Sequence, residues 1–240
     1  MKKIILIIYS YLLLLLSPFK TKTTIYSEKK LIDFVKNNRM SLIRFGDGEY
    51  RLMFSKKGIH YQEYDPKLGK ELLSIFENYD KFKDKYIICI PPFFKNNIFW
   101  FLKNRIELAM CFAKPRLLFR IKQNKKEIYG DAFVFGKGKD DIYSSLWDEK
   151  EKIVLIHNDE KWVKIFNKKY NKKAIFIKTN SNDSYKIIDD IEKKVLNVKN
   201  IENYIVLVSS GPMAKVLAYR LSKRNIQVID TGHFIDDPLV

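Results

Sequence analysis

The chain has 240 residues, of which 46% are hydrophobic and 14% aromatic, so it can bury the core of one globular domain. These values exclude an intrinsically disordered protein. The formal charge of +17 at pH 7 favours anionic partners. Because the lysines are spread along the chain rather than gathered in one stripe, the sequence argues against a dedicated nucleic-acid-binding surface.

The N-terminal segment is apolar from residue 4 to residue 19, with lysines on both sides. A signal peptide would fit the basic start, but residues 17–20 lack a small-x-small cleavage site. A membrane span needs about 20 apolar residues, slightly more than are present. A helix lying in the membrane face is the third arrangement. We expect residues 1–26 to be a membrane-associating segment.

Helices and short apolar strands alternate in the first half of the remaining chain. Apolar periodicity predicts helices over 27–38, 50–54, 65–79 and 97–113, and strands over 41–45 and 86–90. In the third helix, Asp65 is an expected cap that precedes a proline at the first helical position. Residues 116–119 and 133–135 are weaker predicted strands.

The second half of the chain has a regular pattern that defines the fold class. Strands are expected over 152–157, 173–178, 204–209 and 226–230, with helices over 160–170, 184–196 and 211–224. This alternation predicts an α/β protein with a Rossmann-like, mostly parallel sheet and helices on both faces. Ligands would then bind beyond the carboxyl ends of the strands. We expect residues 27–240 to form a single domain.

The two cysteines, Cys89 and Cys111, both lie in apolar patterns. We predict two buried thiols rather than a disulfide, which favours a reducing compartment. The spacing of Cys and His residues does not suggest a zinc site.

One early strand ends in two carboxylates, in the segment Arg44-Phe45-Gly46-Asp47-Gly48-Glu49. Glycine permits unusual backbone angles and close approach to a ligand. Gly46 and Gly48 are therefore expected to aim Asp47 and Glu49 at one point. Two convergent carboxylates beside an arginine suit Mg²⁺ or Mn²⁺ that is itself holding phosphates. The alternative is a plain strand-ending turn with solvated acids.

A second candidate site is the turn Ser210-Gly211-Pro212, where a predicted strand runs directly into a helix. Free amides and the positive end of the helix dipole would bind an anion there. The turn is not a G-x-G-x-x-G fingerprint, so it does not imply NAD. An unliganded tight turn is the alternative.

Polar groups also follow the last predicted strand, in Asp230-Thr231-Gly232-His233. Asp230 and His233 lie at the end of this strand, where polar side chains tend to face the ligand cleft. Either could act as a base toward an acceptor or fix the shape of the pocket, and the sequence does not choose between these roles.

The Arg44–Glu49 segment resembles the signature of the GT-D-type glycosyltransferases, which were first catalogued as a domain of unknown function. The resemblance recurs at Ser210-Gly211-Pro212 and at Asp230-Thr231-Gly232-His233, in the same order. It implies an Asp-x-Glu motif at Asp47 and Glu49 that binds the metal and the diphosphate of a sugar nucleotide. It also places Arg44, Phe45, Gly46, Gly48, Ser210, Gly211 and Pro212 at the donor site.

By this resemblance, the protein is expected to transfer a hexose, with glucose as the expected sugar, from a UDP-sugar. The acceptor would be a glycan of a cell-surface polysaccharide or a glycoprotein. Such an enzyme would work at the cytoplasmic face of a bacterial membrane, where sugar nucleotides are made. A metal-dependent sugar-phosphate transferase or phosphodiesterase is the rival enzyme. A membrane-tethered protein that binds polyanions without catalysis is the other rival.

Overall fold

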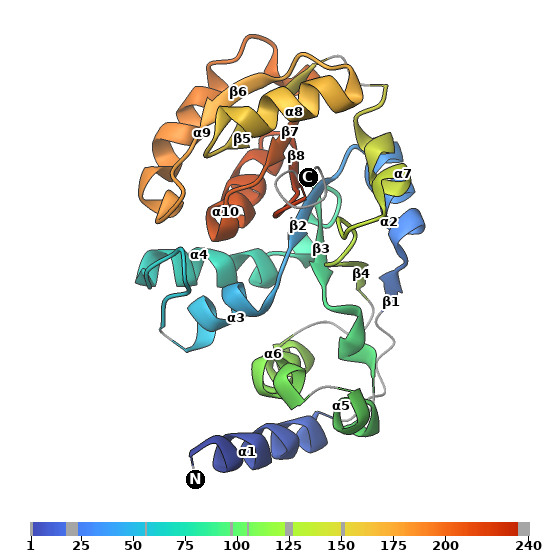
Figure 1. Ribbon diagram of the computed structural model, residues 1–240, viewed down its shortest axis with the longest axis vertical. Coiled ribbons are helices and arrows are strands. Elements are labelled where there is room, and N and C mark those ends of the chain that lie inside the picture. Colours follow the sequence, from blue (N-terminus) through green and yellow to red (C-terminus); the bar gives the residue numbers. More distant parts are fainter. Residues whose placement is uncertain are drawn as a thin grey trace.

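The computed structural model describes residues 2–17, 24–55, 57–96, 98–104, 106–122, 127–149 and 152–234. Within them, eight parallel strands form one sheet in the order β1-β4-β3-β2-β8-β7-β5-β6 (Figure 1). The strands are β1 (Thr24–Tyr26), β2 (Ser41–Arg44), β3 (Tyr86–Ile90), β4 (Ile128–Asp131), β5 (Ile153–His157), β6 (Ile175–Lys178), β7 (Ile205–Val208) and β8 (Gln227–Asp230).

Helices cover both faces of this sheet, as the sequence predicts for a Rossmann-like fold (Figure 1). The α-helices are α1 (Lys2–Leu16), α2 (Glu28–Asn37), α3 (Asp47–Phe54), α4 (Pro66–Glu77), α5 (Ile98–Asn104), α6 (Ile106–Lys122), α7 (Asp140–Tyr143), α8 (Glu160–Tyr170), α9 (Ile188–Leu196) and α10 (Gly211–Ser222). Short 3₁₀ helices are η1 (Asp80–Phe82), η2 (Pro92–Lys95), η3 (Ser144–Leu146), η4 (Ser184–Ile187) and η5 (Ile201–Asn203).

The core has two layers because successive strand residues point to opposite faces of the sheet. In β5, Val154 and Ile156 pack with α4, α9 and α10 on one face, whereas Ile153 and Leu155 pack with α2 and α8 on the other. Every residue of β3, β5, β7 and β8 is buried. A strand that is covered on both faces has a continuous apolar sequence. The positions of these four strands are therefore predicted well from the sequence.

The connections after β5 and β7 place the ligand crevice. The chain leaves β7 for α10 on one face of the sheet and leaves β5 for α8 on the opposite face. Neighbouring strands whose connections diverge in this way leave a crevice at their carboxyl ends, where ligands of open α/β sheets bind.

Several parts of the chain differ from the sequence-based expectations. Residues 116–119 are not a strand but the last part of α6, in which the buried Arg116 donates to the carbonyls of Phe94 and Asn96. Residues 133–135 are a turn, and the strand is the preceding β4. The sequence does not predict β4, because β4 contains Gly130 and Asp131, and both residue types are depleted in strands.

The N-terminal region is more closely joined to the domain than expected. Strand β1 pairs with β4, so the sheet begins before the expected boundary at residue 27. Helix α1 packs along α6, and the hydroxyl of Tyr11 donates to the carbonyl of Phe101. Among the described residues, no helix has both the length and the hydrophobicity needed to cross a membrane.

The two cysteines have different environments, which corrects the expectation of two buried thiols. Cys89 is fully buried in β3, whereas Cys111 is exposed on α6. Burial raises the pKa of the Cys89 thiol well above its ordinary value. Partial desolvation, followed by the nearby Asp47 carboxylate, also raises the pKa of Cys111.

This difference predicts that a maleimide labels one thiol of the native protein and the second only after unfolding. Because the thiolate is the reactive form and desolvation raises the pKa of Cys111, the labelling rate should keep rising above about pH 8.5, the ordinary pKa of a free cysteine. Mass spectrometry of the labelled peptides measures both effects. Rapid native labelling of Cys89 would contradict the burial of β3.

Candidate active site

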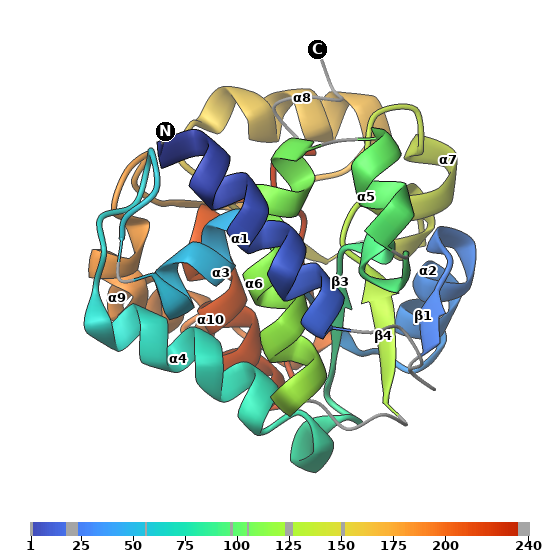
Figure 2. The same ribbon diagram turned by 90° about the horizontal axis from the view of Figure 1, so that it is seen from below.

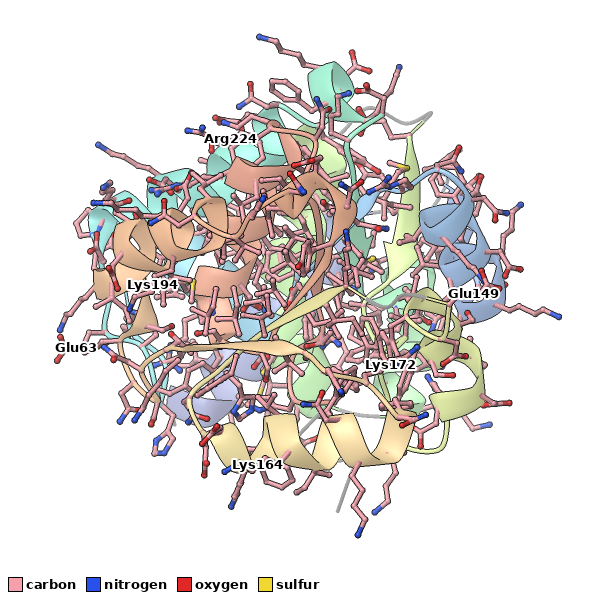
Figure 3. All side chains as sticks on the ribbon, turned by 90° about the horizontal axis from the view of Figure 1, so that it is seen from above. Glu63, Glu149, Lys164, Lys172, Lys194 and Arg224 are labelled. Carbon is pink, nitrogen blue, oxygen red and sulfur yellow. The ribbon has the colours of Figure 1, made fainter. Side chains whose placement is uncertain are left out.

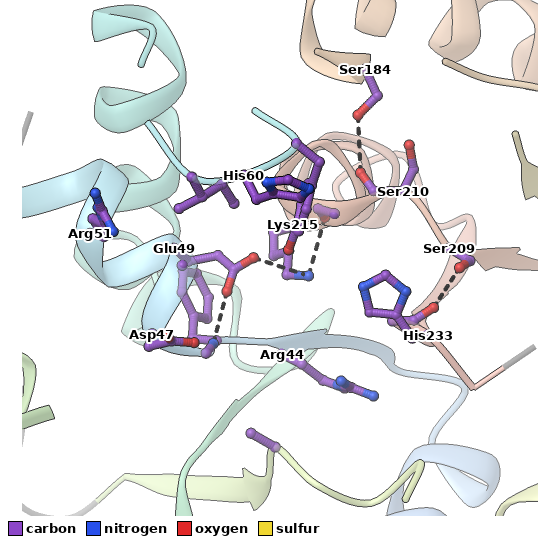
Figure 4. Close-up of a pocket in the computed structure, with 18 of the residues that line it drawn as sticks. Arg44, Asp47, Glu49, Arg51, His60, Ser184, Ser209, Ser210, Lys215 and His233 are labelled. Atoms are coloured by element: carbon purple, nitrogen blue, oxygen red, sulfur yellow. Dashed lines mark hydrogen bonds and ion pairs between the residues drawn. The ribbon is translucent and has the colours of Figure 1, made fainter. Parts of the chain in front are cut away.

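A cavity of about 530 Å³ opens at the carboxyl ends of β2, β5, β7 and β8 (Figure 4). Its size suits a nucleotide-sized ligand. Its polar and charged lining residues are Arg44, Asp47, Glu49, Arg51, His60, Tyr61, His157, Asn158, Asn180, Ser181, Ser184, Ser209, Ser210, Lys215 and His233. Segments far apart in the sequence therefore supply one site, at the edge that the strand order predicts.

The carboxylate pair Asp47 and Glu49 lies in the first turn of α3, not in a loop before the helix. Helical residues two positions apart project roughly 200° from one another. The two side chains therefore leave α3 in different directions, instead of converging as the glycines led us to expect. Neither Gly46 nor Gly48 has a positive φ angle. Gly48 instead allows close packing, because a Cβ there would lie 3.2 Å from Cδ1 of Ile59.

Both oxygens of Glu49 are already engaged. Its Oε2 accepts a hydrogen bond from the Gly46 amide at 2.9 Å, which caps the helix. Its Oε1 lies 3.3 Å from Nζ of Lys215, a buried side chain on α10 (Figure 4). Glu49 itself is 5% exposed. Glu49 thus joins the start of α3 to α10.

Lys215 forms a second ion pair on its other side. Its Nζ lies 3.2 Å from Oδ2 of Asp230, which is fully buried at the end of β8. Asp230 also accepts hydrogen bonds from the amides of Arg44 and Gly232. Burial alone would lower the pKa of Lys215, but Asp230 and then Glu49 outweigh it and raise that pKa. Lys215 is therefore held as a cation beneath the cavity.

Arg44 is fixed at the end of β2 by the turn after β8. Its Nη1 donates to the Thr231 carbonyl at 2.9 Å, and its guanidinium lies over the ring of Phe135. Gly232 has φ +60°, and a Cβ there would lie 2.6 Å from Nη2 of Arg44. Glycine is required at this position both for the backbone angle and for the space that the arginine occupies.

The N-terminus of α10 faces the same cavity. Gly211 has φ +52°, and a Cβ there would lie 2.7 Å from the Tyr61 ring. The Ser210 hydroxyl does not cap α10 but lies 3.2 Å from the Thr179 hydroxyl. Since Pro212 has no amide hydrogen, the early free amides are those of Gly211 and the residues after Pro212. Free amides at a helix N-terminus are a common setting for a bound anion.

Tyr61 is held over Gly211 by the loop between α3 and α4. The Tyr61 carbonyl accepts a hydrogen bond from the Asp183 amide at 2.9 Å. The carboxylate of Asp183 accepts in turn from the Glu63 amide at 2.7 Å. Burial, followed by the nearby Glu49, raises the pKa of Tyr61. Its hydroxyl therefore stays protonated at neutral pH.

The environments of two histidines that line the cavity, His157 and His233, follow from their contacts. His157 is buried, and its Nδ1 accepts a hydrogen bond from the Asp159 amide at 3.1 Å. His233 is exposed to the cavity and meets the Tyr61 ring edge-on. Of this pair, His233 is the one placed to contact a substrate.

The predicted site residues do not all reach the cavity. Arg44, Phe45, Gly46, Asp47, Gly48, Glu49, Ser210, Gly211 and His233 line it. Asp230 and Pro212 do not line it, and both are buried. Asp230 is therefore placed to position Lys215 rather than to meet an acceptor, and Pro212 is a packing residue of α10.

The sequence reasoning missed Lys215 and Tyr61. Lys215 has a recognisable signal, because it is a lone charge within the apolar stretch Met213–Ala218 of a helix that packs on the sheet. A lysine at such a position needs a buried partner. Tyr61 has no comparable signal, since its place depends on the contact of its loop with Asp183.

A divalent cation at this site would have one protein carboxylate as a ligand. No group of three or more Asp, Glu, His or Cys residues within the described ranges could enclose a metal ion. The Asp47 side chain lines the cavity and forms no hydrogen bond or ion pair with another described residue. One carboxylate together with substrate phosphates is a common way to hold Mg²⁺. Asp47 fits that role, whereas Glu49 is occupied by Lys215.

The parallel sheet, the crevice at its carboxyl edge and the helix N-termini at the cavity are features of α/β proteins that bind ligands at their strand ends. A sequence model for glycosyltransferases of the GT-D fold matches residues 42–238. The chain belongs to the GT-D family of glycosyltransferases.

Curated relatives agree with this assignment. The chain is 24% identical to glycosyltransferase GlyD of Streptococcus pneumoniae serotype 4 (strain ATCC BAA-334 / TIGR4), over 84% of this chain and 26% of that protein. It is 25% identical to the probable glycosyl transferase Gly of Streptococcus gordonii, over 91% of this chain and 33% of that protein. The chain thus spans about a quarter to a third of these relatives.

Solved structures resemble the fold. One, described as the highly conserved domain of unknown function 1792 with a distinct glycosyltransferase fold, has a TM-score of 0.75 and 25% identity, over 97% of this chain and 83% of that one. A new glycosyltransferase of the same domain type from Streptococcus sanguinis has a TM-score of 0.73 and 21% identity, over 90% and 83% of the two chains.

The ion pairs of Lys215 yield a prediction about stability. Replacing Lys215 with Met should lower the free energy of unfolding by about 3–5 kcal/mol at pH 7, because two buried carboxylates lose their cation. In the unmodified protein, the raised pKa of Lys215 means that its contribution is complete below pH 10.5 and is lost as the pH rises through the folded-state value. Urea denaturation at several pH values measures each effect.

The matched control is Lys164→Met on α8, where the lysine lies on the outside of the molecule (Figure 3). Lys164 pairs with Glu160 one turn away, and both side chains are more than half exposed. Its replacement should change stability by at most about 0.5 kcal/mol. Equal losses in the two variants would refute the structural role of the buried pair.

Proposed function

We propose that this glycosyltransferase moves a hexose, with glucose as the first candidate, from a UDP-sugar to a glycan acceptor. The observation that carries the proposal is the meeting of two helix N-termini and two arginines, Arg44 and Arg51, at one cavity. That arrangement favours a ligand with concentrated negative charge, such as a nucleoside diphosphate. Family membership supplies the reaction class.

Positive charge at this cavity would favour departure of the diphosphate. As the glycosidic bond breaks, its electron pair goes to the leaving phosphate oxygen. The α10 amides can donate to that group, and the Arg44 guanidinium at the same cavity adds a favourable potential. Lys215 is neutralised by Asp230 and Glu49 and holds α10 against α3 and β8, so the part of these three residues in the reaction is positioning.

We further propose that Mn²⁺ or Mg²⁺ assists, held by Asp47 and the donor's phosphates. When bound, the cation would neutralise the charge that develops on the diphosphate. His233 is our candidate to take the proton from the acceptor hydroxyl, because it is exposed in the cavity. Each of these roles is open to mutation without disturbing the buried ion pairs.

The expected setting is the cytoplasmic face of a bacterial membrane, in the synthesis of a cell-surface polysaccharide or glycoprotein. A screen of UDP-sugars with Mn²⁺, read by mass spectrometry, tests the reaction directly. Release of UDP supports glycosyl transfer or donor hydrolysis. Release of UMP would favour a sugar-phosphate transferase or phosphodiesterase instead.

The two acidic residues should behave differently when mutated. Asp47→Asn should remove Mn²⁺-dependent UDP binding while leaving the melting temperature within about 2 °C, because its carboxylate has no partner among the described residues. Glu49→Gln should lower the melting temperature clearly, since it weakens both the helix cap and the ion pair with Lys215. Calorimetry with UDP and thermal denaturation give the two readouts.

Equal stability losses in Asp47→Asn and Glu49→Gln would contradict this division of roles. Unchanged Mn²⁺-dependent binding in Asp47→Asn would remove Asp47 from the metal site. The two results are independent, so either part of the interpretation can fail alone.

Gly211 gives a separate test of the helix end. Gly211→Ala should reduce UDP affinity by at least tenfold, because its Cβ would meet Tyr61 at 2.7 Å and strain a backbone with φ +52°. Gly138→Ala is the control, since Gly138 has φ +76° but a Cβ there would meet nothing within 4 Å. Both variants bear backbone strain, and only Gly211→Ala should lose UDP in a calorimetric titration.

A further inference from the structure

One side of the molecule exposes an unusual number of large apolar side chains. Helix α1 contributes eight of them, and Phe99, Leu102 and Ile106 on α5 and α6 add three more. Elsewhere in the described ranges, the exposed large apolar side chains are Ile128, Phe133 and Ile175. Figure 2 shows α1 and α5 together on this side, with α6 beside them. We call Ile4, Ile8, Leu12, Leu15, Phe99 and Leu102 the apolar face.

The apolar face differs from an ordinary amphipathic surface. Residues 4–16 of α1 include no charged residue. Its outward side chains are strongly exposed, with Ile4 at 62% and Leu16 at 68%, and Phe99 reaches 72%. Exposed apolar patches of this kind mark contacts with membranes, proteins or apolar ligands. The cavity and the charged residues next to the patch indicate which of these contacts it makes.

A second cavity, of about 300 Å³, lies between α1, α3 and α6. Leu6, Leu13, Phe54 and Met110 supply apolar walls to it. This lining suits a hydrocarbon chain.

This second cavity also adjoins the main one. Asp47 and Arg51 line both cavities, so the walls that receive a hydrocarbon chain continue to the proposed metal site. Arg51 and Lys114 supply positive charge to the second cavity, and both residues are exposed. Apolar walls with cations at one side fit an amphiphile that carries an anionic head group.

We propose that the acceptor is an anionic lipid-linked glycan, taken from a bilayer on which the apolar face lies. Its lipid chain would run along α1, its phosphate would lie near Arg51 and Lys114, and its sugar would reach Asp47. The proposal rests on the proposed function and names its acceptor class. An acceptor hydroxyl oxygen then bonds to the anomeric carbon as the bond to UDP breaks, UDP keeps the electron pair, and the hydroxyl proton goes to a base.

A lipid bilayer explains these features together. A helix that is apolar along its outer side can bury that side at the boundary between head groups and acyl chains. The net charge of +17 adds attraction to an anionic leaflet. The second cavity then lies beside the helix that touches the lipid, which gives a membrane-bound acceptor a short path to the donor site.

Flotation with vesicles tests the surface. The full chain should float with vesicles of phosphatidylcholine and phosphatidylglycerol, and Ile8→Glu/Leu12→Glu should reduce the bound fraction at least tenfold. The control is Ile175→Glu, which changes an exposed isoleucine on β6 and should bind like the unmodified protein. Retained UDP binding and circular dichroism confirm that the double variant is folded. Failure of the unmodified protein to float, or equal binding by the folded double variant, would overturn the proposal.

The exposed Cys111 lines the second cavity and reports its occupancy without any enzymatic turnover. Dodecyl phosphate, below its micelle concentration, should slow maleimide labelling of Cys111 at least fivefold. Inorganic phosphate and dodecyl maltoside should not, and Lys114→Gln should weaken the protection. Absence of protection, or equal protection by either control compound, would refute the amphiphile site.

The outcomes for acceptor and function can be separated. Turnover of a UDP-sugar with a soluble glycan, without Cys111 protection or vesicle binding, would overturn the lipid acceptor alone. Cys111 protection without turnover of any UDP-sugar would count against the proposed function and leave the amphiphile site standing. Association through the apolar face into dimers, detected by size-exclusion chromatography of the protein but not of the double variant, would also overturn the bilayer proposal.

Discussion

The buried contact of Lys215 with Glu49 and Asp230 is the interaction on which the rest of the site depends. Charges removed from water must be paired, and breaking such a pair is far more costly than losing a surface ion pair. The three residues come from α10, α3 and β8, so one lysine fixes the positions of segments almost the whole chain apart. The helix ends after β2 and β7 consequently open on the same cavity.

This constraint also separates the two acidic residues of the Asp-x-Glu motif. Glu49 is committed to the cap of α3 and to Lys215, while Asp47 is left for ligands. The glycines have corresponding packing roles: Gly232 makes room for Arg44 and Gly211 for Tyr61. A motif that looks like a pair of equal metal ligands is, in three dimensions, one structural and one ligand-facing carboxylate. Helix α1 borders the second cavity with Leu6, Tyr9, Ser10 and Leu13, on the side opposite the apolar face, and Asp47 lines the same cavity.

Much of the fold could be predicted because buried parallel strands are continuous apolar runs. The predicted strand over residues 86–90 coincides with β3, and the Asp65 cap of α4 is present. The false strand over residues 116–119 arose because α6 contains Pro115 yet continues through it, with Arg116 buried by long-range hydrogen bonds. The edge at which the site forms followed from topology. The direction of Asp47 and Glu49 did not, because it depends on where α3 begins, and the position of Tyr61 depends on a long-range contact.

The most direct measurement is a crystal structure of the protein with UDP and Mn²⁺. The account predicts the diphosphate at the Gly211 amide, the metal on Asp47, and Lys215 still paired with Glu49 and Asp230. Nucleotide bound away from the ends of β2 and β7 would contradict the site. Glu49 released from Lys215 and bound to the metal beside Asp47 would contradict the division of the motif into a structural and a ligand-facing carboxylate.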